Sequence, residues 1–224
     1  MDCITDQQLE HLLSFIGFGR LEADTWFLGM EEGGGGEENI RTRLKFEVVE
    51  DNMHAHELLG IHDWHWGKRK IQPTWRGMCY LMLRLNGEIP DREKIRTYQA
   101  EELGRSHGDT FLCELMPLPK TSLSEWEYKT LFPQYHSLEE YYERVKPRRI
   151  QMYRKLVKQY HPKRIVAYGK YYWEDYQSIF KGTTFRPTGK FLCAESDGSM
   201  VVLTAHFTAR TMNHQWDNLA ELIS

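Results

Sequence analysis

Cysteine is scarce in this chain, with four among 224 residues, and no two of them are close together. Cys3, Cys79, Cys113 and Cys193 form no C-x-x-C pair, which argues against a disulfide framework and against a four-cysteine zinc or iron–sulfur site. Three of them stand in apolar runs, where a free thiol behaves as a small hydrophobic side chain.

Long apolar runs are missing as well. No stretch approaches the roughly 18 apolar residues that a membrane-spanning helix requires. The N-terminal segment MDCITDQQLEHLL is acidic and amphipathic, unlike a basic leader followed by an apolar core. We therefore expect a cytoplasmic protein without a membrane partner.

A dominant charge of one sign is also lacking, because the formal net charge is only −3. A dedicated nucleic-acid binder is usually more basic. One local run, residues 144–170, is nevertheless rich in lysine and arginine. This run either contacts phosphates or forms the solvated face of a helix.

Aromatic residues are abundant, with seven Trp and twelve Tyr. They either fill the edges of the core or line a groove in which flat rings stack on a ligand.

Apolar runs alternate with helical patterns along the chain, which predicts an α/β fold. We expect a single domain over residues 1–224, built as a three-layer αβα sandwich around a central, mainly parallel four-stranded sheet. Apolar runs that predict strands cover residues 24–30, 110–119, 163–169, 191–195 and 200–206. Helices are expected from Thr5 to Ile16, over 37–52, from Pro73, over 91–105, 138–160 and 171–180, and after a cap at Asn213, whereas 53–72 is expected to be irregular.

Polar residues follow the predicted strands, at the edge where open α/β sheets bind ligands. They form four groups, Glu31 to Gly36, Glu114 to Pro119, Gly169-Lys170, and His206 to Arg210. Glycines allow backbone N–H groups to approach a ligand, and carboxylates can hold a water molecule or a developing cation. Any α/β domain has polar loops at this edge, so these residues mark a candidate site that spacing alone does not establish.

The motifs FLGMEEGGG, LCELMPLP, IVAYGK and LTAHFTAR, in this order, resemble those of the uracil-DNA glycosylase superfamily. The resemblance spans residues 27–210. The scattered cysteines do not match the branch that holds an iron–sulfur cluster, and we expect no cofactor and no metal. The resemblance implies an enzyme that hydrolyses the N-glycosidic bond of a modified or mispaired base.

The resemblance also implies residue roles. Glu31 would be the carboxylate that orients the attacking water, and His206 would polarise a base carbonyl. Glu114 stands where the family has an Asn that reads the base, and an ionised Glu would suit a base edge that presents amino groups. The other implied substrate-binding residues are Glu32, Gly33, Trp75, Lys170, Thr208 and Arg210, with Trp75 as the stacking ring.

The chain departs from the family motifs at several positions. Met30 occupies the place where other branches carry the catalytic carboxylate, and Glu32 and Phe207 replace prolines. These changes leave two alternatives open. One is a catalytically silent module that binds nucleic acid or nucleotide, and the other is a small-molecule hydrolase that uses Glu31 and Glu32.

We expect a monomer whose partner is DNA, single- or double-stranded, or a nucleotide. A metal site is a further possibility that the histidines of residues 54–65 raise, with Glu57 or Asp63 as an added ligand. Their spacing matches no zinc signature, so we do not predict one.

Overall fold

The computed structural model describes residues 3–67, 69–122 and 124–224. In this part of the chain the strands are β1 (Gly17–Gly19), β2 (Thr25–Gly29), β3 (Val49–Glu50), β4 (Thr110–Glu114), β5 (Arg164–Tyr168), β6 (Arg186–Thr188), β7 (Phe191–Ser196) and β8 (Ser199–Thr204). They form one sheet in the order β3-β1-β4-β2-β5-β8-β7-β6.

The middle of the sheet is parallel. β2 pairs in parallel with β4 and β5, and β5 pairs in parallel with β8. These strands correspond to four of the predicted apolar runs. Apolar side chains along each of them suit strands that helices cover on both faces.

The sheet is wider than predicted and is mixed. β1 is antiparallel to β4, and β7 is antiparallel to β8 and β6. β1, β3 and β6 are only two or three residues long, too short to show an alternating pattern in the sequence. The β7–β8 hairpin follows from Asp197 and Gly198, whose positive φ angles of 50° and 82° match a tight two-residue turn.

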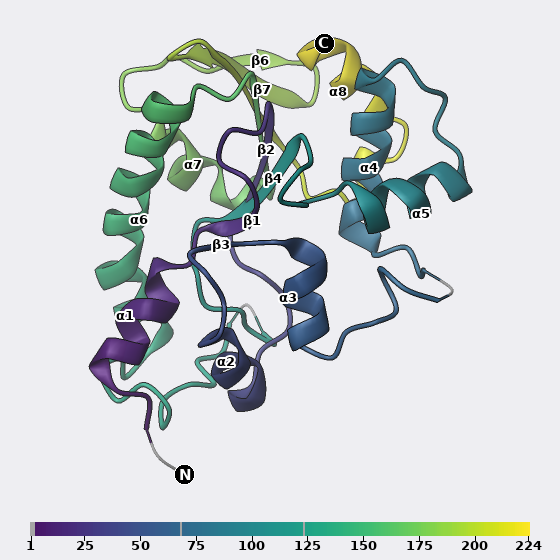
Figure 1. Ribbon diagram of the computed structural model, residues 1–224. Helices are drawn as coiled ribbons and strands as arrows, with labels where there is room; N and C mark the ends of the chain where they lie inside the picture. Colours follow the sequence, from purple (N-terminus) through teal and green to yellow (C-terminus); the bar gives the residue numbers. More distant parts are fainter. Residues whose placement is uncertain (1–2, 68, 123) are drawn as a thin grey trace.

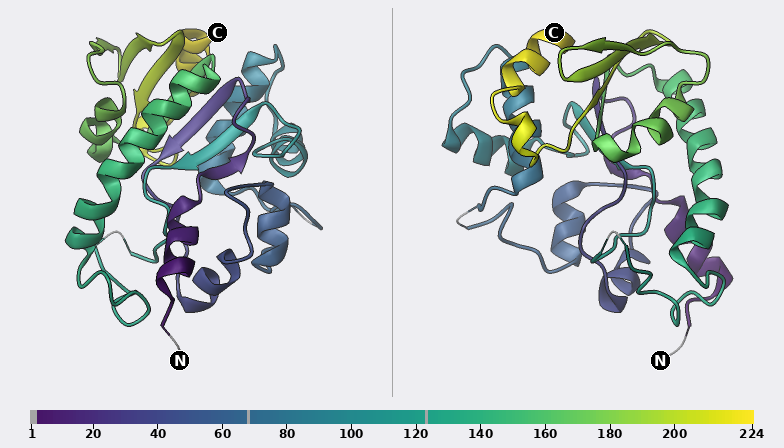
Figure 2. Two further views of the ribbon diagram at one scale, coloured as in Figure 1. Left: turned by 60° about the vertical axis from the view of Figure 1, so that its left-hand side comes forward. Right: turned by 180° about the vertical axis from the view of Figure 1, so that it is seen from behind.

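Helices lie on both faces of the sheet (Figure 1), and Figure 2 shows α6 crossing one face. The α/β class is therefore confirmed, while the predicted count of four strands is wrong. The helices are α1 (Asp6–Ser14), α2 (Glu37–Arg43), α3 (Asn52–Leu58), α4 (Pro73–Leu85), α5 (Arg92–Glu101), α6 (Leu138–Tyr160), α7 (Trp173–Ile179) and α8 (Trp216–Ile223), with short 3-10 turns η1 (Lys170–Tyr172) and η2 (Arg210–Met212).

Two apolar cores separate the layers, because successive side chains of a strand point to opposite faces. On β2, Trp26 and Leu28 belong to the core that includes residues of α1, α6 and α7. Phe27 belongs to the core that includes residues of α4, α5 and α8. The same alternation repeats on β4, β5 and β8, which fixes the register of the sheet between the two helical layers.

Several helix boundaries differ from the predictions. The helix predicted over 37–52 ends at Arg43, and Asp51 caps a new helix in the segment predicted to be irregular. The last helix begins at Trp216 rather than at a cap on Asn213. α6 runs through Pro147 without a break. α1 begins close to the predicted Thr5, where Thr5 and Gln8 form a capping box. No helix in the described ranges is long and apolar enough to span a membrane.

Candidate functional site

A cleft of about 330 Å³ opens at the carboxyl ends of the parallel strands. Gly29 of β2 and Glu114 of β4 are register partners, so the segments that follow β2 and the end of β4 meet here. Six of the predicted site residues line the cleft: Glu31, Glu32, Gly33, Trp75, Glu114 and His206. Lys170, Thr208 and Arg210 do not line it.

Glu31 is held inside the cleft wall by two partners. Its Oε1 lies 3.2 Å from Nζ of Lys120, and its Oε2 accepts a 2.7 Å hydrogen bond from the hydroxyl of Tyr142. The two charged side chains are almost fully buried, at 3% and 1% exposed. Burial raises the pKa of Glu31, while the Tyr142 hydrogen bond and the charge of Lys120 oppose that change. The carboxylate has lone pairs beyond these two contacts, but its Oε1 is itself buried.

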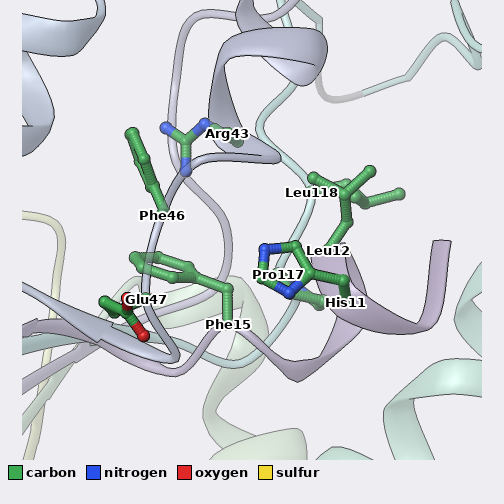
Figure 3. A pocket seen from close by; sticks show the side chains of 8 residues that line it. All are labelled: His11, Leu12, Phe15, Arg43, Phe46, Glu47, Pro117 and Leu118. Carbon is green, nitrogen blue, oxygen red and sulfur yellow. The ribbon is translucent and has the colours of Figure 1, made fainter. Parts of the chain in front are cut away.

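Glu32 forms a two-pronged ion pair with Arg43. Nη1 and Nη2 of Arg43 donate to the two carboxylate oxygens at 2.9 and 2.7 Å, and Nε donates to Asn39. The guanidinium lies over the rings of Phe46 and Phe15, at 5.3 and 5.8 Å from their centroids. Figure 3 shows Arg43, Phe46 and Phe15 at a small pocket of about 10 Å³ that shares Phe15 and Arg43 with the cleft.

Glu114 differs from its two neighbours because no ion pair involves it among the described residues. Its Oε1 accepts from the hydroxyl of Tyr168 at 2.7 Å, and its buried Oε2 has no hydrogen-bond partner in the described part of the chain. Arg149 and Tyr153 donate to the main-chain carbonyl of Glu114 and not to its carboxyl group. Thus the nearest arginine anchors the backbone of Glu114 and not its carboxyl group.

The protonation of Glu114 follows from this imbalance of charge. Burial raises its pKa well above the ordinary 4.5, and the nearby charges of Glu32 and Glu31 raise it further, while the Tyr168 hydroxyl acts in the opposite direction. These causes favour the neutral carboxylic acid, in contrast to the ionised group assumed from the sequence. A carboxylic acid offers one O–H donor and one carbonyl acceptor, as an amide does.

Glu114→Gln is expected to flatten the dependence of stability on pH. The folded chain binds the Glu114 proton more tightly than the unfolded chain does. The free energy of unfolding therefore falls by up to about 1.4 kcal/mol per pH unit as pH rises from the ordinary pKa to the raised one. Gln is neutral throughout and removes this slope. Urea denaturation between about pH 5 and 8 measures it, with the exposed Glu195→Gln as a control. Equal slopes in wild type and Glu114→Gln would mean that Glu114 is ionised.

Gly29 leaves the space that the Glu114 carboxyl group occupies. A Cβ at Gly29 would overlap the carboxyl group of Glu114 and the hydroxyl of Tyr168. We expect Gly29→Ala to lower the free energy of unfolding by about 1–3 kcal/mol and to displace Glu114. Gly33→Ala is the control, because a Cβ there meets no atom within 4 Å. Denaturation curves of the two variants check this, and equal stabilities would contradict it.

His206 is positioned by Thr208, two residues along the same loop. The backbone N–H of Thr208 donates to Nδ1 of His206 at 3.3 Å, and the Thr208 hydroxyl lies 2.7 Å from the same nitrogen. An Nδ1 that accepts a hydrogen bond leaves the proton of a neutral imidazole on Nε2. Burial lowers the pKa of His206, which favours this neutral form. His206 can therefore donate from Nε2 to an oxygen in the cleft.

An aromatic wall faces these polar groups. Trp75 and Trp64 both line the cleft and pack edge to face, with centroids 5.0 Å apart. His56 also lines the cleft. Its Nδ1 lies within hydrogen-bond distance of the Asn52 carbonyl and of Nε2 of His65. Burial lowers the pKa of His56 to about 3 and that of His65 to about 4, so both are neutral at pH 7. Within the described ranges, no three His, Cys, Asp or Glu side chains are grouped to hold a metal.

The remaining predicted residues lie outside the cleft. Lys170 begins η1 and is exposed, with Nζ 5.7 Å from the ring centroid of Trp173. Arg210 begins η2 and is also exposed. Thr208 contacts His206 rather than the cleft. The substrate-binding roles predicted for Lys170 and Arg210 stay predictions.

Four residues of the site were missed in the sequence: Arg43, Lys120, Tyr142 and Tyr168. Tyr168 had a usable signal, because it ends an apolar run directly before Gly169. Lys120 follows the proline turn after β4. Arg43 and Tyr142 lie in ordinary helical sequence, and only the packing of α2 and α6 brings them to the carboxylates.

A comparison with protein-family models finds no match, and a comparison with curated protein sequences finds no significant relative. The function proposed below therefore depends on the residues of the chain and on the motif resemblance.

Proposed function

We propose that the chain hydrolyses the N-glycosidic bond of a modified or mispaired base in DNA. The observation that carries this proposal is the content of one cleft, which combines a buried carboxylate, a neutral histidine donor and an aromatic wall. A base needs a ring on which to stack, and its departure needs stabilisation of charge on both the sugar and the base.

In the proposed reaction, a base flipped out of the stack lies against Trp75. Nε2–H of His206 donates to a base carbonyl and stabilises the negative charge that develops as the C–N bond breaks. Glu31 accepts a hydrogen bond from the attacking water and stabilises the positive charge on the sugar. The base leaves as an anion and takes a proton from solvent. The water adds to the sugar carbon, its proton passes to Glu31, and Glu31 then releases that proton to solvent.

Glu114 would read the edge of the base. As a neutral acid it can donate to a base carbonyl and accept from a base N–H, whereas an ionised Glu could only accept. The raised pKa of Glu114 thus favours a base that carries a carbonyl next to an N–H at this edge. This reverses the preference for amino groups expected from the sequence.

A second candidate is a catalytically silent module that binds nucleic acid or nucleotide. It is favoured by one observation: both oxygens of Glu31 and both oxygens of Glu32 already contact other side chains. A carboxylate held in this way can serve the structure alone.

A cleavage screen separates the two candidates. Single- and double-stranded oligonucleotides, each with one modified base, are incubated with wild type and His206→Ala and then heated in alkali to break the strand at abasic sites. Strand breaks that form with wild type, and form less often with His206→Ala, support base excision. The oligonucleotide that breaks identifies the base. Intact strands across the panel, with folded protein that still binds them, reject excision in favour of the silent module.

A further inference from the structure

A second and larger groove, of about 690 Å³, lies beside the cleft. The two hollows share walls. α4 contributes Thr74 and Trp75 to the cleft but Pro73, Arg76 and Tyr80 to the groove. The loop after β8 divides in the same way, with His206 in the cleft and the next two residues in the groove. α4 and the loop after β8 therefore lie between the two hollows.

The groove holds two cations, Arg76 and Arg92, that no carboxylate among the described residues neutralises. No ion pair of Arg76 or Arg92 is found in the described part of the chain, and both side chains are exposed. Other cations of the same two helices are all paired, Arg84 with Asp217, Lys94 with Glu88 and Arg96 with Glu93. The groove also contains Asp91, whose carboxylate caps α5 by accepting from the backbone of Lys94.

The basic run predicted from the sequence is different, because the fold engages much of it. Arg149 and Arg154 donate to backbone carbonyls, and Lys146 pairs with Asp175. Arg144 pairs with Glu140. Lys155 and Lys158 of this run are exposed and have no ion pair among the described residues, but neither lines the groove.

Aromatic rings complete the groove. The guanidinium of Arg76 lies 5.5 Å from the ring centroid of Trp216, and the rings of Trp216 and Tyr80 are 5.1 Å apart. A guanidinium held against a ring is already oriented, so it loses less freedom when it binds a phosphate. Cations next to aromatic faces are the pattern by which proteins bind single strands without reading sequence.

We propose that this groove binds the single strand that flanks the base in the cleft, with Arg76 and Arg92 on its phosphates and Tyr80 and Trp216 against a neighbouring base. The proposal rests on the proposed function for the position of the target base. Binding of an unmodified strand is nevertheless measurable without any excision.

The test is fluorescence anisotropy with a labelled, unmodified single strand of about 12 nucleotides, titrated over a range of salt concentrations. Arg76→Gln and Arg92→Gln are each expected to lower the slope of log affinity against log salt by about 0.7. The control is Arg148→Gln, which removes the same charge from an arginine that is 74% exposed on α6. Trp216→Leu is expected to weaken binding by about 5- to 140-fold, with thermal melting to check that it folds.

The outcomes distinguish the groove from the proposed function. Unchanged slopes for both groove variants, or an equal loss with Arg148→Gln, would overturn the groove. So would an acidic peptide that binds the groove as tightly as the strand does. If no base is excised but the groove variants lose strand affinity, the groove holds and the proposed activity fails. If excision occurs and the variants bind normally, only the groove is rejected.

Discussion

Glu31→Gln is expected to slow base release by about 10²- to 10⁴-fold while single-strand affinity stays within twofold of wild type, about 0.4 kcal/mol. Gln has nearly the same shape, and its amide oxygen can still accept from Tyr142 or Lys120. It cannot take a proton from water or carry the negative charge that stabilises the sugar cation. Single-turnover rates with the base identified in the cleavage screen measure the effect.

The single-turnover rate is also expected to depend on pH, and the direction of this dependence follows from the pKa shifts of Glu31 and His206. In the proposed reaction Glu31 acts when ionised, so we expect the rate to fall as pH drops through its raised pKa. Burial lowers the pKa of His206, which favours its neutral imidazole. Tyr142→Phe removes a hydrogen bond that lowers the pKa of Glu31, and it should move the acidic limb of the rate profile to higher pH. A Glu31→Gln variant as fast as wild type would exclude Glu31 from the reaction.

Arg43→Ala is expected to lower the free energy of unfolding by about 3–5 kcal/mol. Arg43 is only 5% exposed and its partner Glu32 is 19% exposed, so the change leaves a poorly hydrated carboxylate without its cation. It also removes the guanidinium that lies over Phe15 and Phe46. Urea denaturation measures the loss.

A matched control lies on the same helix. Arg41 pairs with Glu37 one turn apart, but both side chains are 37% exposed. Arg41→Ala should therefore cost less than about 1 kcal/mol. The double variant Arg43→Met with Glu32→Gln should recover much of the loss, because it leaves neither charge unpaired. If Arg43→Ala lowers the free energy of unfolding as little as Arg41→Ala does, water screens the pair of Arg43 and Glu32.

The location of the site could be predicted from the sequence. β2, β4, β5 and β8 are apolar runs bounded by glycine, proline or polar residues, and such runs in an α/β pattern form a parallel centre. Parallel strands bring their carboxyl ends to one edge of a sheet. For this reason Glu31, Glu114 and His206, more than 80 residues apart in sequence, line the same cleft.

The partners of the site could not be predicted in the same way. Arg43 and Lys120 reach Glu32 and Glu31 only because α2 and the segment after β4 pack beside the first loop. The strands β1, β3 and β6 are too short to show an alternating pattern in the sequence, and they are defined by their pairing with neighbouring strands. Helix propensity likewise gives no sign that Tyr142 of α6 faces a carboxylate.

The sequence by itself determined the α/β class, the order of the central strands along the chain and the edge at which polar residues gather, because these follow from local apolar patterns and chain direction. Only the tertiary structure decided which charged side chains lie next to the three carboxyl groups. Two of them are next to a cation and the third is not, and that difference comes from packing. The pKa of Glu114 depends on the water and charges that surround it in space, which no sequence interval encodes.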